Sequence, residues 1–390
     1  MADRARRSLL ALYLASAVFV TVQQGILGRS NNFTVFRAAA TNLLAHRDLY
    51  AAHPDQHFDF YKYSPTFALL FAPLAALPFA PALLIWSLLN SLLLWYAVRR
   101  LLPDRQATLA LALVYLEVLF AMQYTQSNGL VAALLLLAFL ALEAGRQLRA
   151  ALLVGLDACI KVFPLGGVAL ALFHARRARF ALLLAGVGVG LALLPLVVIP
   201  AHELIAQYRS WWTIETADAS RVNRGDSVMQ YLYQWLGADW PHWPVQLAGT
   251  LLLLAPLAVQ RGRWSDRAFR LRFLCSLLVY LVLFNHQSER ASFVIAYTGL
   301  ALWYAASEPD RVRTAISLAG VAALVLQDVE ILPWSAHNAL GYYRVKGIPC
   351  LVAWIVMQAE LLGWRRWSPR SYGPEVGQAY VPPPEPLASR

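Results

Sequence analysis

Long apolar runs make up most of this chain, and short polar segments rich in arginine or in acids separate them. Many runs reach the length of about 20 residues that a helix needs to cross a hydrocarbon layer of about 30 Å. The pattern therefore predicts an all-α fold, a polytopic transmembrane helical bundle of roughly ten to twelve membrane helices. We expect a membrane domain over residues 1–364 and a disordered, proline-rich cytoplasmic tail over residues 365–390.

Composition supports this class, because 59% of the residues are hydrophobic and only 14% are charged. The net charge of +11 would suggest a nucleic-acid partner in a soluble protein. Here the arginines stand in short clusters between apolar runs, as in cytoplasmic loops, so we expect no nucleic-acid partner. The histidines and the three cysteines lack metal-ligand spacing, so we predict no metal site, and we expect no cofactor.

The arginine clusters predict how the chain threads the membrane. Arg4, Arg6 and Arg7 precede the first apolar run, which indicates a signal anchor with a cytoplasmic N-terminus. With all clusters inside, we expect a multi-pass membrane protein. Its external segments would then be residues 28–64, 122–128, 201–245, 285–290 and 333–345.

Residues 65–98 fit this topology poorly. They must cross the membrane an odd number of times, although Pro73, Pro78 and Pro81 interrupt them. A short helix followed by a full helix is an alternative, and it would invert the polarity between Arg99 and Arg149.

Residues 150–174 also fit a single crossing poorly, because arginines flank them on both sides and so place both ends on the same side of the membrane. They predict two short helices with a turn at Pro164. Asp157 and Lys161 lie four residues apart near that turn, which suits a helical ion pair. Two interpretations stay open: the pair stabilises a bent hairpin, or Lys161 faces a wet cavity and binds an anionic group such as a lipid phosphate.

The first external segment, residues 28–64, carries most of the candidate chemistry. We expect an interfacial amphipathic helix from Phe33 to Ala45. Its apolar face would consist of Phe36, Ala40, Leu43 and Leu44. Beyond it come Asp48, Asp55 and Asp59, and then aromatic residues including Tyr61 and Tyr63. Each acid alone fits a solvated surface position, whereas three acids in one external loop point to a functional role. The aromatics suit either a membrane-interface belt or a substrate site.

Three motifs in order, "YKYSPTFALLFAPLAALP", "QSNG" and "GLDACIKVFPLGG", resemble glycosyltransferase family 87 of the C-type superfamily. That family's pattern is a Y-x-Y-x-P segment, a GQ-x-N turn and a hairpin with a lysine shortly before Y-P. The resemblance covers residues 30–180 well and the later half only in hydropathy. A bacterial branch with "NNF" early and "NHQSE" late is most similar.

The resemblance implies an inverting hexosyltransferase that moves a mannose-like hexose from a polyprenyl-phosphate donor to a lipid or glycan acceptor. The protein would lie in the bacterial plasma (inner) membrane, with its active site facing outside and an external carboxylate as general base. Lys161 matches the family's hairpin lysine and would contact the donor phosphate. Gln126 and Asn128 match the turn only partly, because Thr125 replaces its glycine and Ser127 intervenes.

The chain departs from the family at the start of the loop helix, where Asn31 and Asn32 stand in place of a common aspartate. An amide cannot act as a general base. The base is therefore another loop acid, or this branch does different chemistry. The predicted catalytic residues are Asp59, which we prefer, and Asp48. The predicted substrate-binding residues are Lys161, Tyr61, Tyr63, Gln126, Asn128, Asn32, His286 and Arg290.

Two other functions fit the pattern. A transporter of lipid-linked sugars or solutes would use Asp157 and Lys161 as coupling charges, and a non-catalytic relative would bind a lipid-linked sugar. The many acids in external segments and the lack of an evident internal repeat favour the transferase.

Overall fold

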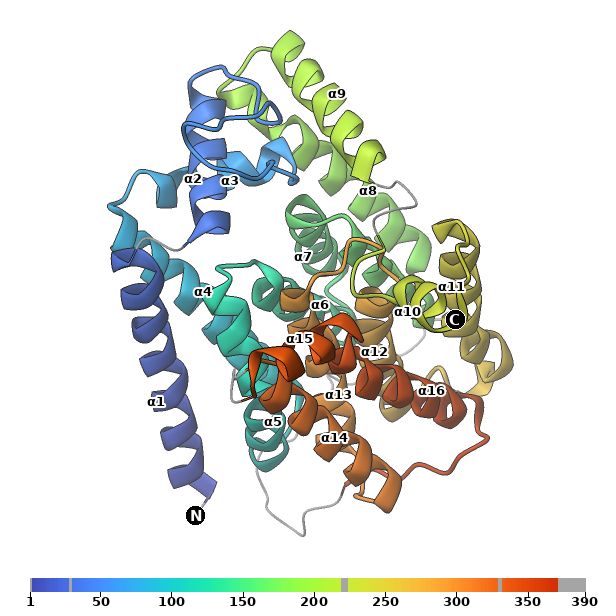
Figure 1. Ribbon diagram of the computed structural model, residues 1–390. Helices are drawn as coiled ribbons and strands as arrows, with labels where there is room; N and C mark the ends of the chain where they lie inside the picture. Colours follow the sequence, from blue (N-terminus) through green and yellow to red (C-terminus); the bar gives the residue numbers. More distant parts are fainter. Residues whose placement is uncertain (1, 28–29, 219–223, 329–331, 371–390) are drawn as a thin grey trace, which may run out of the picture.

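The computed structural model describes residues 2–27, 30–218, 224–328 and 332–370, and the regular elements in these ranges are all helices (Figure 1). This confirms the all-α prediction. The α-helices are α1 (Ala2–Val20), α2 (Asn31–Leu44), α3 (Pro65–Ala75), α4 (Phe79–Leu101), α5 (Asp104–Gln123), α6 (Asn128–Glu143), α7 (Gln147–Ile160), α8 (Arg177–Leu193), α9 (Ala201–Asp218), α10 (Val228–Leu236), α11 (His242–Val259), α12 (Arg267–Leu283), α13 (Phe293–Ala306), α14 (Arg311–Asp328), α15 (Trp334–Tyr342) and α16 (Ile348–Leu362). The short helical pieces are η1 (Thr21–Ile26), η2 (Phe163–Phe173), η3 (Leu194–Val197), η4 (Arg261–Arg263), η5 (Arg290–Ser292) and η6 (Val345–Gly347).

Several of these helices suit a membrane. Six are long and apolar enough to span one: Asp3–Ile26, Phe79–Leu101, Asp104–Gln123, Arg177–Val197, His242–Val259 and Val345–Leu362. Shorter apolar helices lie at Pro65–Ala75, Asn128–Glu143 and Phe163–Phe173. The chain is therefore a multi-pass membrane protein, as its hydropathy predicts.

The arginine clusters gather at one end of the bundle. Arg6 and Arg99 both pair with Asp104, and Arg270 holds Glu143 at 2.6 Å. The amide of Gln106 donates to the carbonyl of Arg370, so the last described residue lies at the same end as α1's start. The first residues of the predicted tail are packed here, and residues 371–390 lie outside the described part.

The segments predicted to be external meet at the opposite end. The side-chain amide of Asn32 donates to the Tyr124 carbonyl at 2.8 Å, which joins the first segment to the second. Further contacts join the other segments: His46 with Glu203, Gln126 with Glu289, and Arg344 with Asp226. The structure thus separates the basic clusters from the acid-bearing segments, as the charge pattern predicts.

Residues 65–98 form a short helix and a full helix, yet the polarity after them does not invert. The guanidinium of Arg37 on α2 donates to the carbonyls of Leu74 and Leu77, so α3 stays beside α2. Only α4 runs on to the basic end, at Arg99.

Residues 147–173 form the predicted hairpin. Helix α7 ends at Ile160, Lys161 is extended with φ −142°, and η2 begins at Phe163. The arms are about 21 and 22 Å long at the rises of the two helix types. The side-chain amide of Gln147 donates to the Arg176 carbonyl at 3.2 Å, so both arms start at the basic end. The hairpin therefore turns back short of the roughly 30 Å hydrocarbon thickness.

The predicted amphipathic helix corresponds to α2, which begins at Asn31 and ends at Leu44. Phe36, Ala40 and Leu43 are buried as expected, where Phe36 packs edge-on against Phe67 and Phe71 of α3. The assignment of Leu44 to that face is wrong, because Leu44 ends the helix and is 51% exposed. The apolar face of α2 therefore serves to pack α3 under the loop that follows.

The close packing of α7 on α8 gives a test of the hairpin. A Cβ atom at Gly155 of α7 would lie 2.7 Å from Val187 and 3.1 Å from Leu191, both in α8. We expect Gly155→Leu to destabilise the protein by roughly 1–3 kcal/mol through overpacking. Gly186→Leu is the matched control, because a Cβ at Gly186 meets no atom within 4 Å. Thermal unfolding in detergent measures both, and equal melting temperatures would contradict the packing.

Candidate functional site

A polar cavity of about 540 Å³ lies where the hairpin apex meets the segments of the acidic end. Distant parts of the chain supply its walls, including the loop before α3, helix α9, the loop before α10 and the turn before η5. Its polar lining consists of Asn32, Asp59, Lys62, Tyr63, Gln126, Lys161, Trp211, Glu215, Arg224, Asp226, Gln230, Asn285, Gln287, Ser288, Glu289, Arg290 and Arg344. We call this space the polar cavity.

Ser64 ties the loop before α3 to the hairpin apex. Its hydroxyl donates to the carbonyl of Cys159 at 2.7 Å and accepts the backbone N–H of Phe67 at 3.1 Å. One side chain thus satisfies a carbonyl left open where α7 ends and caps the start of α3. The contact brings Tyr63 and Lys161 together, and the Lys161 ammonium lies 6.0 Å from the Tyr63 ring centre.

Lys161 does not pair with Asp157, which corrects the ion-pair interpretation. Only the backbones of these residues are hydrogen-bonded, and the buried Asp157 carboxylate has no hydrogen-bond partner among the described residues. The reason is that Lys161 leaves the helix: its extended backbone takes the side chain off the α7 surface and into the polar cavity.

A series of side-chain hydrogen bonds crosses the polar cavity. The Tyr63 hydroxyl donates to Gln126 Oε1 at 3.3 Å, and Gln126 Nε2 donates to Glu289 Oε2 at 3.0 Å. Burial, and then the charge of Glu289, raises the pKa of Tyr63 well above its usual value, so the phenol keeps its proton. Gln126 thereby links the loop before α3 to the turn before η5.

Thr125 stands where the family's turn motif has a glycine, and its contacts explain how the turn accommodates it. Its φ is +53°, a left-handed conformation that favours glycine and costs a β-branched residue of order 1–3 kcal/mol. The threonine returns hydrogen bonds that glycine lacks, because its hydroxyl accepts from the Phe33 N–H at 3.1 Å and from the Ser30 hydroxyl. The turn therefore keeps its shape and presents Gln126 to the polar cavity.

The two candidate bases occupy different places. Asp59 lines the polar cavity, and one carboxylate oxygen accepts the Phe60 N–H at 2.8 Å. Asp48 does not line it: its oxygens accept the Tyr50 N–H and the Ser210 hydroxyl, both at 3.0 Å. Asp48 therefore joins its loop to α9.

The structure brings six of the predicted site residues together in the polar cavity: Asp59, Lys161, Tyr63, Gln126, Asn32 and Arg290. The other four are Asp48, described above, Tyr61, Asn128 and His286. Tyr61 is buried with its hydroxyl donating to the Ser64 carbonyl, and Asn128 is buried at the start of α6. His286 stacks on His242 at 5.0 Å instead of facing the polar cavity.

Sequence reasoning missed several cavity residues that come from the second half of the chain. Both oxygens of Glu215 accept hydrogen bonds, one from Trp211 at 3.2 Å and one from Gln287 at 3.0 Å. Asp226 pairs with Arg344 at 3.0 Å. All of them lie in segments whose acids and arginines predict an external position, but that signal does not say which side chains converge.

Gly225 makes the approach of two of these segments possible. Its φ is +53°, and a Cβ there would lie 2.5 Å from the His286 carbonyl oxygen and 2.6 Å from that of Ser288. The next N–H, of Asp226, donates to the Ser288 carbonyl at 2.8 Å. Burial raises the pKa of Asp226, and the positive charge of Arg344 opposes that rise.

Two cations of the polar cavity lack an ion-pair partner among the residues that the structure describes. Arg224 pairs with Asp239 at 2.5 Å and Arg344 with Asp226, whereas Lys161 and Arg290 form no ion pair with any described residue. The guanidinium of Arg290 lies against Gly341, where any side chain would collide with it. Such cations suit an anionic ligand, and Asp59, with one oxygen uncommitted among the described residues, suits a proton acceptor.

Because Lys161 forms no ion pair, replacing its side chain should have little effect on the stability of the fold. We expect Lys161→Met to change the free energy of unfolding by about 1 kcal/mol or less, because no acid loses its partner. Lys346→Met is the contrast, since Lys346 lies 2.6 Å from the buried Glu117. Leaving that acid alone should cost roughly 3–5 kcal/mol. Chemical unfolding in mixed micelles measures both, and a large loss for Lys161→Met would show a structural role.

Comparison with known proteins places this chain in a family. The profile of glycosyltransferase family 87 matches residues 60–284, more than half of the chain. No curated protein sequence matches it. Among solved structures it is similar to ArnT from Cupriavidus metallidurans bound to undecaprenyl phosphate, with 12% identity, 91% of this chain and 77% of that chain covered, and a TM-score of 0.46. It is also similar to the Archaeoglobus fulgidus oligosaccharyltransferase in the apo form, with 12% identity, 90% and 56% covered, and a TM-score of 0.39. The chain belongs to glycosyltransferase family 87.

Proposed function

We propose that this membrane glycosyltransferase moves a hexose, mannose-like, from a polyprenyl-phosphate donor to a lipid or glycan acceptor on the external face of the bacterial inner membrane. The proposal rests on the polar cavity, which is lined both by two cations without an ion pair and by a carboxylate with an uncommitted oxygen. Family membership supports sugar transfer, and the site within a helical bundle supports a donor that is itself a membrane lipid.

Lys161 and Arg290 would hold the donor phosphate. They reach the polar cavity from the hairpin apex and from η5, so a phosphate between them would be bound from two sides. Each charge-assisted hydrogen bond contributes roughly 1.5–3 kcal/mol. Both grow stronger as negative charge develops on the leaving phosphate, which lowers the barrier as well as binding the donor.

The reaction would proceed by direct displacement. The acceptor hydroxyl oxygen attacks the anomeric carbon, the Asp59 carboxylate takes the hydroxyl proton, and the bond from that carbon to the phosphate oxygen breaks. The bonding electrons leave with the polyprenyl phosphate, beside Lys161 and Arg290. One displacement inverts the anomeric centre, and atoms and charge balance without a metal or cofactor.

The acceptor would enter from the side formed by α9 and the loop before α10. Trp211 provides an aromatic surface there, and Arg224 and Arg344 provide hydrogen-bond donors, a combination that suits a sugar or a lipid headgroup.

Asp59 gives the sharpest test of the chemistry. We expect Asp59→Asn to lower transfer roughly a hundredfold to ten-thousandfold, because an amide cannot take the proton. Asp48→Asn is the matched control, an acid of the same loop outside the polar cavity, and should keep most of the activity. The assay incubates membranes containing each variant with radiolabelled polyprenyl-phosphate mannose or polyprenyl-phosphate glucose and follows label in the acceptor fraction.

The outcomes separate the candidate functions. Transfer that survives in Asp59→Asn but not in Asp48→Asn would exchange the two roles. Donor retained by the wild type without any transfer would favour a binding protein, and label crossing a sealed vesicle would favour a transporter. If Lys161 contacts the donor phosphate, Lys161→Met should weaken donor binding about tenfold or more, whether the protein is a transferase, a binding protein or a transporter.

Orientation is tested by labelling from outside intact cells. Phe58, beside the polar cavity, is 87% exposed, so Phe58→Cys should react with a membrane-impermeant maleimide. Arg177→Cys, at the basic end, should react only after permeabilisation. Both substitutions are made in a cysteine-free parent protein in which Cys159, Cys275 and Cys350 are replaced by alanine. The reverse labelling pattern would show that the polar cavity opens to the cytoplasmic side of the membrane.

A further inference from the structure

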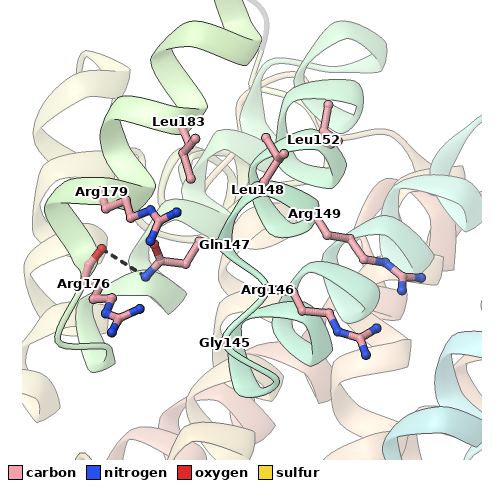
Figure 2. Close-up of a pocket in the computed structure, with 9 residues that line it drawn as sticks. All are labelled: Gly145, Arg146, Gln147, Leu148, Arg149, Leu152, Arg176, Arg179 and Leu183. Atoms are coloured by element: carbon pink, nitrogen blue, oxygen red, sulfur yellow. Dashed lines mark hydrogen bonds between the residues drawn. The ribbon is translucent and has the colours of Figure 1, made fainter. Parts of the chain in front are cut away.

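A second pocket, of about 470 Å³, lies at the basic end, at the base of the hairpin (Figure 2). The connection from α6 to α7 and the start of α8 form it. We call it the arginine pocket, lined by Gly145, Arg146, Gln147, Leu148, Arg149, Leu152, Arg176, Arg179 and Leu183. It is remote from the polar cavity, because α7 runs about 21 Å from one to the other.

The four arginines of this pocket lack the acids that accompany several, though not all, of the other arginines at the same end. Arg99 has Asp104, Arg270 has Glu143, and Arg313 has Glu360. By contrast, the guanidinium groups around the arginine pocket form no ion pair or hydrogen bond with any residue that the structure describes. Topology alone requires arginines at this end, but it does not require four of them around one hollow without a counter-charge.

Apolar side chains border the arginine pocket toward the membrane. Figure 2 shows Leu148, Leu152 and Leu183 together on one side of the arginines. Leu148 and Leu152 are 53% and 43% exposed. Helix α8 continues this surface, since only 11% of its most apolar stretch is buried within the protein. A ligand bound here would therefore meet positive charge at one end and a lipid-facing apolar surface at the other.

We propose that the arginine pocket binds the phosphate of an anionic phospholipid of the membrane leaflet at the basic end. The headgroup would lie over the hollow between Arg146 and Arg149 on one side and Arg176 and Arg179 on the other (Figure 2), and an acyl chain would follow the leucines along α7 and α8. Guanidinium groups bind phosphate through paired N–H donors, and the bound anion supplies a counter-charge where the described residues provide none. The site is separate from the proposed donor site and makes no use of it.

Lipid binding by the full-length protein tests the proposal. The wild type, purified in detergent, is titrated with dioleoyl-phosphatidylglycerol, dioleoyl-phosphatidylcholine or water-soluble glycerol 3-phosphate, and bound lipid is counted by native mass spectrometry. We expect retention of phosphatidylglycerol alone. Arg149→Gln with Arg179→Gln should weaken it roughly tenfold to thirtyfold, from about 1 kcal/mol per arginine.

The matched control is Arg100→Gln with Arg261→Gln, which removes two unpaired charges from the same end outside the pocket. It should bind phosphatidylglycerol like the wild type. Equal binding by all three proteins, equal loss in both double variants, or equal retention of phosphatidylcholine would overturn the proposal, as would glycerol 3-phosphate binding as tightly as the lipid. A melting curve without lipid confirms that each variant is folded, and Arg149→Lys with Arg179→Lys, which keeps both charges, should restore part of the affinity.

Discussion

The hydrogen bond from the Ser64 hydroxyl to the Cys159 carbonyl connects the two parts of the molecule that make the site. A hairpin with arginines at both ends cannot cross the membrane, so its chain must break and turn within the bundle. Breaking a helix exposes carbonyls that lipid cannot satisfy. Ser64 supplies the missing donor and also begins α3, so the break in α7 and the end of the acid-bearing loop are held at one point.

The same break gives Lys161 its place. A lysine inside α7 would lie against neighbouring helices near Asp157, whereas the extended residue at the helix end enters the polar cavity. An intramembrane ammonium is costly unless it meets water, an acid or a ligand, and here it meets water-accessible space and the ring of Tyr63. A phosphate group would supply the missing counter-charge. The arginine pocket repeats this principle at the other end of the hairpin, with several arginines in place of one lysine.

Features that depend on local pattern could be predicted from the sequence. Flanking arginines with Pro164 predict the hairpin, and its apolar periodicity predicts α2. Features that depend on side-chain direction could not. Tyr61 and Tyr63 look equivalent in the sequence, but only Tyr63 faces the polar cavity, because Tyr61 turns its hydroxyl to the Ser64 carbonyl. The convergence of Glu215, Asp226 and Glu289 depends on the packing of distant loops, including the close approach at Gly225, which no local pattern records.

In the proposed function, Lys161 and Arg290 hold the phosphate of a lipid-linked donor in the polar cavity. A cryo-electron microscopy structure of the protein in a lipid nanodisc with added polyprenyl phosphate tests it most directly. We expect phosphate density in contact with both the Lys161 ammonium and the Arg290 guanidinium, with the polyprenyl chain leaving between helices toward the membrane. A phosphate bound elsewhere, with the density between these two side chains filled only by water, would contradict it.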